Sequence, residues 1–428
     1  MIKTSREEIH ADNFKNLHRW EKEYFTRARS LPFAITMILV LRNSIKSLQN
    51  VVNEALISLD KNTVTASAYS QARYKLKHTA FIALNQKAII ETMYGDDDYQ
   101  KFWGFRILAV DGSKIVLPDN EEVCNEFGTM KWTHKSGIKG KKPYATASVL
   151  YDVFNRVSLD ATLGRADAYE VDLAIAHLLH TRRNDLLVMD RGYTSYRMIA
   201  ELTKYERDYV IRCSAMSFQT ARDMLAGEGE DSQIVTLTPC DKQAVLMAEM
   251  NLSMSLRVRF VRVTLSTGEY EVLVTSLLDE QRYPTKEFLA LYWFRWEIET
   301  FYGLLKTRLD LENFTGNGVE AVRQDFYATI YLTGMESILT DAAQAQLDAK
   351  QNAKYAQVVN RSVSFNAIKY HAFALLWSNL EPEPLFEKLT ALFLTSPTIQ
   401  REGRNPSRKK SSASKRLNFH KRKKKPCF

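Results

Sequence analysis

The segment Tyr292–Lys306 constrains this chain more than any other, because it predicts a proline-free helix with two different sides. At about 100° per residue, its polar and phenolic side chains fall within a stripe about 60° wide: Tyr292, Arg295, Glu299 and Lys306. Apolar side chains lie opposite and predict a buried face: Phe294, Ile298, Phe301, Leu304 and Leu305. A carboxylate flanked by two cations suits a site that holds a divalent metal together with a phosphate backbone. The alternative is a surface helix in which Arg295 and Glu299 form an ordinary stabilising pair.

Length and composition predict several folded domains followed by a basic tail. The chain has 428 residues, of which 45% are hydrophobic, enough for a sizeable core. The formal net charge is +9, but residues 401–428 hold twelve Lys or Arg and one Glu, a net charge of +11. The first 400 residues therefore carry −2. Any nucleic-acid binding by the folded part must depend on local basic patches.

The cysteines argue against a structural zinc site or a disulfide framework. Cys124, Cys213, Cys240 and Cys427 form no Cys-x-x-Cys pair. We therefore expect reduced thiols in a cytosolic protein. No apolar stretch approaches the roughly 20 residues that span a bilayer, and the first residues form no apolar signal segment. We expect no membrane association.

Residues 1–100 predict a helical region. Two helical patterns, Asn43–Ser58 and Thr65–Asn85, are separated by a short break, and the second carries Arg73 and Lys75. A helix-turn-helix that contacts DNA fits this arrangement. Spacing alone favours the alternative, a helical bundle with a solvated basic face.

Residues 101–213 alternate strands and helices in the order of an RNase H-like fold: three strands, a helix, a strand, a helix and a strand. Strands are expected at 106–117, 144–152, 155–163, 185–190 and 208–212, and helices at 167–180 and 196–205. We therefore predict an α/β core with a mixed sheet and flanking helices. The alternation alone fits many α/β folds.

Two carboxylates stand on the expected strands of this core. Asp111 directly follows an apolar run in the first strand, and Asp190 closes the fourth. The carboxyl end of a strand is a usual place for α/β chemistry. The structural alternatives are an Asp-Gly turn at Asp111 and a helix cap at Asp190. Three nearby carboxylates are weaker candidates: Asp119, Asp185 and Glu297.

Residues 214–268 predict a β-rich insertion, because about a hundred residues separate Asp190 from Glu299, more than one helix–strand unit needs. Strands are expected at 234–237, 244–250 and 256–265, with a bulge in the last. The core then resumes over 269–310 with another strand and the helix around Glu299.

Three arginines of the insertion are candidates for contacts with a DNA backbone: Arg257, Arg259 and Arg262. A solvated sheet face explains them equally well.

Residues 311–400 predict a C-terminal helical region, and residues 401–428 predict a disordered basic tail. Such a tail adds salt-dependent, sequence-independent affinity for DNA. The alternative is a tail that only increases solubility.

The residues around Glu299 resemble the signature of DDE transposases of the bacterial insertion-sequence-four family. In that signature two residues separate a Tyr from an Arg, three residues separate the Arg from a Glu, and six residues separate the Glu from a Lys. Tyr292, Arg295, Glu299 and Lys306 have this spacing. Residues 311–316 and 319–327 also resemble the family. The Asp-Gly at Asp111 and the Asp-Arg-Gly-Tyr at Asp190 match as well. The resemblance implies that Asp111, Asp190 and Glu299 are the catalytic carboxylates. They would hold two Mg²⁺ ions, for which Mn²⁺ can substitute.

The resemblance also implies a function. The protein would bind transposon terminal repeats through its N-terminal helices, cleave the ends and transfer their 3′-OH strands to target DNA. Tyr292, Arg295 and Lys306 would contact the end DNA. A homodimer in a synaptic complex, at the nucleoid in a bacterial cytoplasm, is the expected assembly. The rival functions are an RNase H-like nuclease without strand transfer and a DNA-binding protein without catalysis.

One departure from the resemblance concerns hairpin formation. Relatives that form hairpin ends use a tryptophan of the insertion, whereas all six tryptophans here lie outside residues 191–292. The sequence therefore does not decide between cleavage through a hairpin and simple cleavage.

Overall fold

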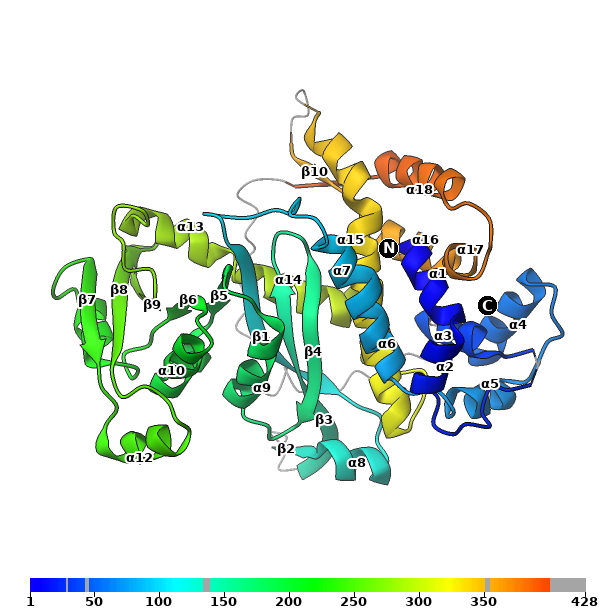
Figure 1. Ribbon diagram of the computed structural model, residues 1–428, viewed down its shortest axis with the longest axis horizontal. Helices are drawn as coiled ribbons and strands as arrows, with labels where there is room; N and C mark the ends of the chain where they lie inside the picture. The colour runs from blue at the N-terminus through cyan, green and yellow to red at the C-terminus, as the bar shows by residue number, and fades with distance from the viewer. Residues whose placement is uncertain (28–29, 43–45, 134–138, 351–354, 401–428) are drawn as a thin grey trace. The chain divides into compact units, whose positions relative to one another are not determined.

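The computed structural model describes residues 1–27, 30–42, 46–133, 139–350 and 355–400 (Figure 1). The chain forms two compact units. The sheet unit comprises Asp98–Lys114 and Thr146–Gly303, and the helical unit comprises Met1–Asp97, Ile115–Ala145 and Leu304–Phe428. Within the described ranges, no helix combines the length and the apolar character that crossing a membrane requires. The basic tail that we expected at 401–428 lies outside the described residues.

The sheet unit is built on the strand order β4-β3-β1-β5-β6. The strands are β1 (Arg106–Val116), β3 (Lys139–Asp152), β4 (Val157–Arg165), β5 (Asp185–Met189) and β6 (Asp208–Arg212). β1, β5 and β6 run parallel, and α9 (Glu170–His177) and α10 (Tyr196–Lys204) lie between strands along the chain. This order confirms the predicted RNase H-like core.

The central strands are apolar without alternation because both of their faces are covered. Every residue of β5 is buried, and so are the first five residues of β1. Continuous apolar runs are typical of parallel strands that carry helices on both faces of a sheet. Burial of α10 residues such as Met198 and Leu202 provides one such cover.

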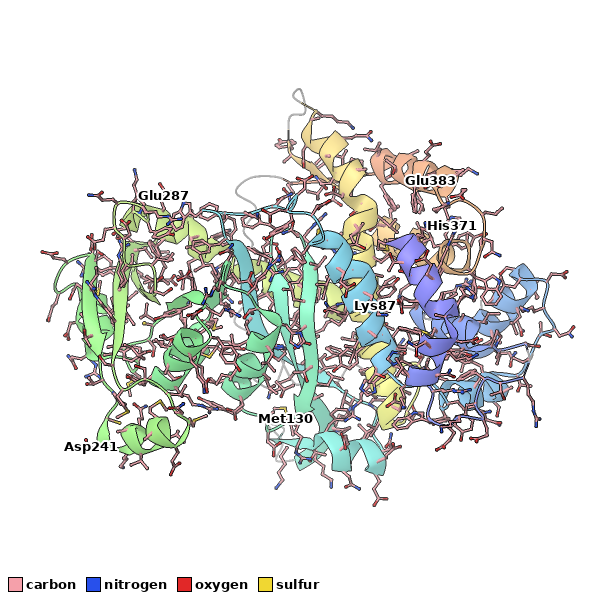
Figure 2. The ribbon with its side chains drawn as sticks, in the orientation of Figure 1. Lys87, Met130, Asp241, Glu287, His371 and Glu383 are labelled. Atoms are coloured by element: carbon pink, nitrogen blue, oxygen red, sulfur yellow. The ribbon has the colours of Figure 1, made fainter. Side chains whose placement is uncertain are left out.

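The β-rich insertion continues the same sheet beyond β6 (Figure 1). β7 (Ser232–Leu237), β8 (Leu256–Thr264) and β9 (Tyr270–Thr275) are joined antiparallel, and β9 pairs antiparallel with β6. The strand predicted at 244–250 is wrong, because these residues belong to α12 (Asp241–Glu249), whose first residue is labelled in Figure 2. The predicted bulge is also wrong: β8 pairs residue for residue with both neighbours, and its hydrophobic phase changes because its middle is buried on both faces.

The helical unit gathers helices from both ends of the chain around α15 (Val319–Asp348). The N-terminal helices are α1 (Ile2–His10), α2 (Asp12–His18), α3 (Phe33–Leu41), α4 (Leu48–Ser58), α5 (Ala66–Arg73), α6 (Thr79–Leu84) and α7 (Glu91–Met93). The later ones are α8 (Glu121–Phe127), α16 (Arg361–Tyr370), α17 (Ala372–Leu376) and α18 (Glu383–Thr395). α15 contacts α3 and α6 from the N-terminal region and α16 and α18 from the C-terminal region. Both predicted helical regions are therefore present, and they share one core.

Smaller elements complete the helical unit. β2 (Thr129–Thr133) pairs antiparallel with the first residues of β3, and β10 (Gln357–Val358) pairs with β11 (Thr398–Ile399). A π-helical turn, Asn85–Ile90, follows α6. Its Lys87, labelled in Figure 2, forms an ion pair with Glu8 of α1 at 2.8 Å.

Arg73 is a packing residue of the helical unit, which corrects its proposed contact with DNA. Its side chain is buried, and its guanidinium donates to Gln324 Oε1 at 2.6 Å and to Asp325 Oδ1 at 2.7 Å. It also donates to Thr315 and to the backbone of Ala321. A guanidinium whose donors are used inside the fold is not available to a phosphate.

We predict that Asp185→Asn destabilises the sheet unit strongly. Arg106 and Asp185 face each other on β1 and β5 in a buried two-point ion pair, with both N–O distances 2.7 Å. The substitution removes the carboxylate that pairs with a buried cation and should cost about 3–5 kcal/mol of unfolding free energy, measured by urea denaturation.

The exposed pair Arg165–Asp167 provides the matched control. Asp167→Asn should change stability by no more than about 1 kcal/mol. Equal effects of the two substitutions would contradict the structural importance that we assign to the buried pair.

Candidate functional site

Asp111 and Asp190 stand next to each other because of the register of two parallel strands. The pairing of β1 with β5 ends at Val110 and Met189, and each carboxylate is the next residue along the chain, Asp111 within β1 and Asp190 just after β5. Both side chains are half-buried. The sheet unit thus brings together two candidates that are far apart in sequence.

Both carboxylates accept a hydrogen bond from the backbone that follows them. Asp111 Oδ1 accepts from the Gly112 N–H at 2.8 Å, and Asp190 Oδ1 accepts from the Arg191 N–H at 2.6 Å. Asp190 thereby caps the 3₁₀ turn Arg191–Tyr193. The cap considered for Asp190 therefore exists, whereas Asp111 and Gly112 lie inside β1 and form no turn. These hydrogen bonds leave the second oxygen of each carboxylate available for other ligands.

Glu299 lies on α14 (Trp296–Gly303), and a second residue of that helix anchors it to the sheet. The Tyr302 hydroxyl lies 2.9 Å from the carbonyl oxygen of Asp111 and 3.0 Å from that of Ala147 on β3. Tyr302 is three residues, or almost one helical turn, beyond Glu299. This contact fixes the helix against the strand that carries Asp111. The spacing of residues in the sequence did not predict it.

The helix around Glu299 is less regular than expected. α13 (Phe288–Trp293) ends before α14 begins, and the backbone N–H groups of Phe294 and Arg295 bond to carbonyls three residues earlier. A π-helical turn, Leu304–Arg308, follows α14. The prediction of one regular helix over 292–306 is therefore wrong, because the winding is tight at one end and wide at the other.

The irregular winding changes which side chains are buried. Tyr292 and Arg295 are almost fully buried, whereas Trp293 and Glu297 are exposed. The exposure of Glu297 agrees with its position outside the predicted polar stripe. Tyr292 and Arg295 of the stripe are therefore packed inside the sheet unit and do not form a solvated helix face.

Arg295 is the cation that neutralises Glu299. Its Nη1 atom lies 2.9 Å from Glu299 Oε1, and its guanidinium packs 4.0 Å from the centre of the Trp296 ring. Ion pairs four residues apart commonly stabilise helices. This pair is unusual because the arginine is buried while the carboxylate is partly exposed.

Burial and neighbouring charges act on Asp111. Burial is the main cause that raises the pKa of Asp111 to about 6, while the Gly112 N–H and Arg295 lower it and Glu299 and Glu170 raise it further. Like charges close together raise a carboxyl pKa because two anions repel. The site therefore concentrates negative charge, and Glu170 joins it as a residue that the sequence analysis missed.

Two buried hydroxyls of the site have no hydrogen-bond partner within the described part of the chain: Tyr193 Oη and Tyr292 Oη. Burial raises the pKa of both phenols, and Asp190 raises it further in each case. The Arg295 Nε atom is similarly unpaired among the described residues. Buried polar atoms of this kind are expected where a ligand or ordered water completes the site.

The residues fit a divalent cation by their chemistry. Carboxylate oxygens are the ligands that Mg²⁺ and Mn²⁺ prefer, and Asp111, Asp190 and Glu299 supply them in one unit. Within the described ranges, no three acidic, His or Cys side chains are yet close enough to hold a metal between them. The three carboxylates would have to move closer together for one metal ion to contact all of them.

Lys306 belongs to the helical unit, on the π-helical turn Leu304–Arg308. Burial lowers the pKa of its ammonium group, and the nearby Glu312 acts in the opposite direction. Lys306 therefore lies outside the unit that holds the three carboxylates.

Arg259 and Arg262 hold the fold of the insertion, which corrects their proposed contacts with DNA. Arg259 is fully buried and donates to Ser232, Tyr283 and Thr285. Arg262 pairs with Asp231 at 2.7 Å and donates to carbonyls of residues 224, 228 and 229.

Two other basic candidates remain accessible. Arg257 is exposed on β8, and Lys75 is half-buried after α5, with its ammonium 5.3 Å from the centre of the Tyr24 ring.

A Ser-His-Asp row in the sheet unit is structural. His177 lies 2.9 Å from Ser148 Oγ and 2.6 Å from Asp160 Oδ2, as in a hydrolase triad. Ser148 and His177 are completely buried. A nucleophile must reach its substrate, so this row satisfies polar groups of the core.

Known proteins that are similar to this chain include transposases. Residues 103–332 match the family described as transposase DDE domain. The transposase InsG for insertion sequence element IS4 of Escherichia coli (strain K12) is 24% identical over 314 residues, which cover 71% of this chain and 69% of the relative.

A solved structure is also similar. The piggyBac transposase in a synaptic complex with hairpin DNA aligns with a TM-score of 0.42 and 11% identity, over 97% of this chain and 85% of that one.

We predict that Asp111→Asn stabilises the metal-free protein at neutral pH. The pKa of Asp111 is raised, so the folded state binds this proton more tightly than the unfolded chain does. The cost of ionisation is then fully present above about pH 6 and disappears below about pH 4. The rise of the Asp111 pKa from 3.8 to about 6 corresponds to about 3 kcal/mol of lost unfolding free energy when the carboxyl is ionised.

Urea denaturation in EDTA tests this sign. The variant should gain up to about 3 kcal/mol at pH 7.5 and about half of that at pH 5. A loss of stability at pH 7.5, or a gain that does not depend on pH, would contradict the electrostatic cost assigned to Asp111.

Proposed function

The chain belongs to the transposase DDE family and is a DNA transposase of the insertion-sequence-four type, and we propose that Asp111, Asp190 and Glu299 form its active centre. The observation that carries this proposal is the anchoring of α14 by Tyr302. That contact ties the helix of Glu299 to the backbone of Asp111, and Asp111 and Asp190 each follow the last residue pair of β1 and β5.

Members of this family generally use divalent metal ions, and we propose two Mg²⁺ ions here, with Mn²⁺ as a substitute. Asp111, Asp190 and Glu299 are the residues that would hold them. When bound, such ions activate the attacking water and stabilise the leaving 3′ oxygen. Asp111 must be ionised to take part, so metal binding should weaken as the pH falls through about 6.

The proposed reaction has two steps at phosphorus. Water first attacks the phosphodiester at the transposon end, a new P–O bond forms, and the bond to the 3′ oxygen breaks. The released 3′-OH then attacks a phosphodiester of the target, where one P–O bond forms as another breaks. Each step exchanges one phosphodiester oxygen for another and requires no covalent bond to the protein.

Arg295 has a second role in this proposal. In this structure it pairs with Glu299. If Glu299 held a metal ion, the Arg295 guanidinium would be free to pair with the negative charge of the scissile phosphate. Arginine suits this task because its planar fork can donate two hydrogen bonds to a phosphate. Tyr292, whose hydroxyl is buried and unpaired within the described ranges, would hydrogen-bond to the end nucleotide.

The rest of the DNA interface is proposed at three further residues and in the basic tail. Lys306, Lys75 and Arg257 would contact the backbone of the ends, and the basic residues of 401–428 would add salt-dependent affinity. Two ends must be brought together before joining, which favours a homodimer. Such a dimer would act on chromosomal DNA at the nucleoid.

We predict that Glu299→Gln abolishes end cleavage and leaves end binding intact. Removing a metal ligand should cost at least about 100-fold in rate, because even groups that only orient a ligand cost 10–100-fold. Labelled DNA with the element's terminal repeats is incubated with Mg²⁺ or with EDTA, and binding is followed by mobility shift. The control is Glu297→Gln, two residues earlier and exposed, which should cleave like wild type.

The products separate the rival functions. Cleavage without joining to new DNA would identify a nuclease without strand transfer, and tight binding without any cleavage would identify an inactive binder. Denaturing gels distinguish hairpin ends from open ends. If Glu299→Gln cut as fast as wild type, the active centre proposed here would be wrong.

A further inference from the structure

Glu170 is a half-buried carboxylate beside the proposed active centre. It is the first residue of α9, and its side chain packs against Gly112, the residue after Asp111. A methyl group at position 112 would lie 2.9 Å from Glu170 Cδ and 3.2 Å from Oε2. The absence of a side chain at Gly112 therefore makes room for this carboxylate next to Asp111.

Glu170 differs from the other three carboxylates in its partners. Asp111, Asp190 and Glu299 each accept a hydrogen bond from a backbone N–H or from Arg295. Within the described part of the chain, Glu170 accepts none and forms no ion pair. The described residues give this half-buried carboxylate no cationic partner, so a bound cation fits its position.

The Tyr193 hydroxyl provides an independent sign of a missing ligand. It is almost fully buried and has no hydrogen-bond partner among the described residues. After burial itself, the groups that raise the pKa of Tyr193 are Asp111, Glu170 and Asp190. One unpaired, buried hydroxyl thus lies within electrostatic reach of three carboxylates, an arrangement that suits a hydrated cation among them.

We propose that Glu170 is a fourth carboxylate of this centre and binds the hydration shell of the divalent cations held by Asp111, Asp190 and Glu299. The proposal rests on the proposed function, because it concerns the same metal ions. Four carboxylates carry the charge that balances two divalent cations, and Arg295 then remains to balance the phosphate. Mg²⁺ keeps several waters when bound to proteins, so an acceptor beyond its direct ligands is expected.

The alternative explanation of Glu170 is structural: a negative charge in the first turn of α9 stabilises the helix. Asp172 tests that explanation, because it lies in the same first turn, is more than half exposed and already pairs with Arg197 at 2.7 Å. Helix stabilisation would treat the two residues alike. A role in cation binding would concern Glu170 alone.

The test is a Mn²⁺ titration of the full-length chain, read from the electron paramagnetic resonance signal of free Mn²⁺ and requiring no turnover. Glu170→Gln should weaken Mn²⁺ binding by about 10-fold or more, and Asp172→Asn should bind like wild type. Circular dichroism confirms that each variant is folded. Equal binding by Glu170→Gln and wild type, or equal weakening by both variants, would overturn the proposal.

Gly112→Ala gives a second test through geometry. The added methyl should push Glu170 away and weaken Mn²⁺ binding in the wild-type background. In a Glu170→Ala background the methyl meets no carboxyl group, so the effect should disappear. If Gly112→Ala lowered Mn²⁺ affinity equally in both backgrounds, the cause would be a disturbance of strand β1. That result would contradict a role of Glu170 in cation binding.

Glu299→Gln separates this proposal from the proposed function. If Glu299→Gln weakens Mn²⁺ binding and Glu170→Gln does not, only the role of Glu170 fails. If neither substitution matters, or if wild type binds no Mn²⁺, the metal centre itself fails.

Discussion

The hydrogen bonds of one tyrosine hold the proposed active centre together. Tyr302 reaches from α14 to the carbonyl oxygens of Asp111 on β1 and Ala147 on β3. This contact sets the height and rotation of the helix over the sheet, and therefore the position of Glu299 relative to Asp111. The strand pairing that ends at Val110 and Met189 supplies the other fixed relation, between Asp111 and Asp190. A rigid sheet and an anchored helix are what a site needs if several carboxylates must meet at one point.

The centre is assembled at an electrostatic cost. Asp111 is buried near Glu299 and Glu170, which raises its pKa, and the hydroxyls of Tyr193 and Tyr292 are buried without partners in the described ranges. A protein selected only for stability would avoid both features, because buried charges and unpaired polar atoms oppose folding. Their concentration in one place is typical of functional sites, where local stability is given up for ligand binding.

The basic residues divide into structural and accessible groups. Arg73, Arg106 and Arg259 are buried and use their donors inside the fold, whereas Arg257 is exposed. Residue type alone did not separate these groups, since an arginine on a strand or helix fits a phosphate or a buried carboxylate equally well. Partners such as Asp325 and Tyr283 are distant in sequence or lie in loops, so only the folded chain identifies them.

The sequence by itself determined the RNase H-like strand order, the two helical regions and the family signature around Glu299. Those features depend on local patterns: apolar runs, turn residues and fixed spacing. Only the tertiary structure decided the broken winding around Arg295, the helix at 241–249 and the neighbours of Asp111. Tyr302 and Glu170 could not be found from spacing, because they meet Asp111 and Gly112 across 191 and 58 residues of chain. Such meetings are set by packing between elements, which no local pattern records.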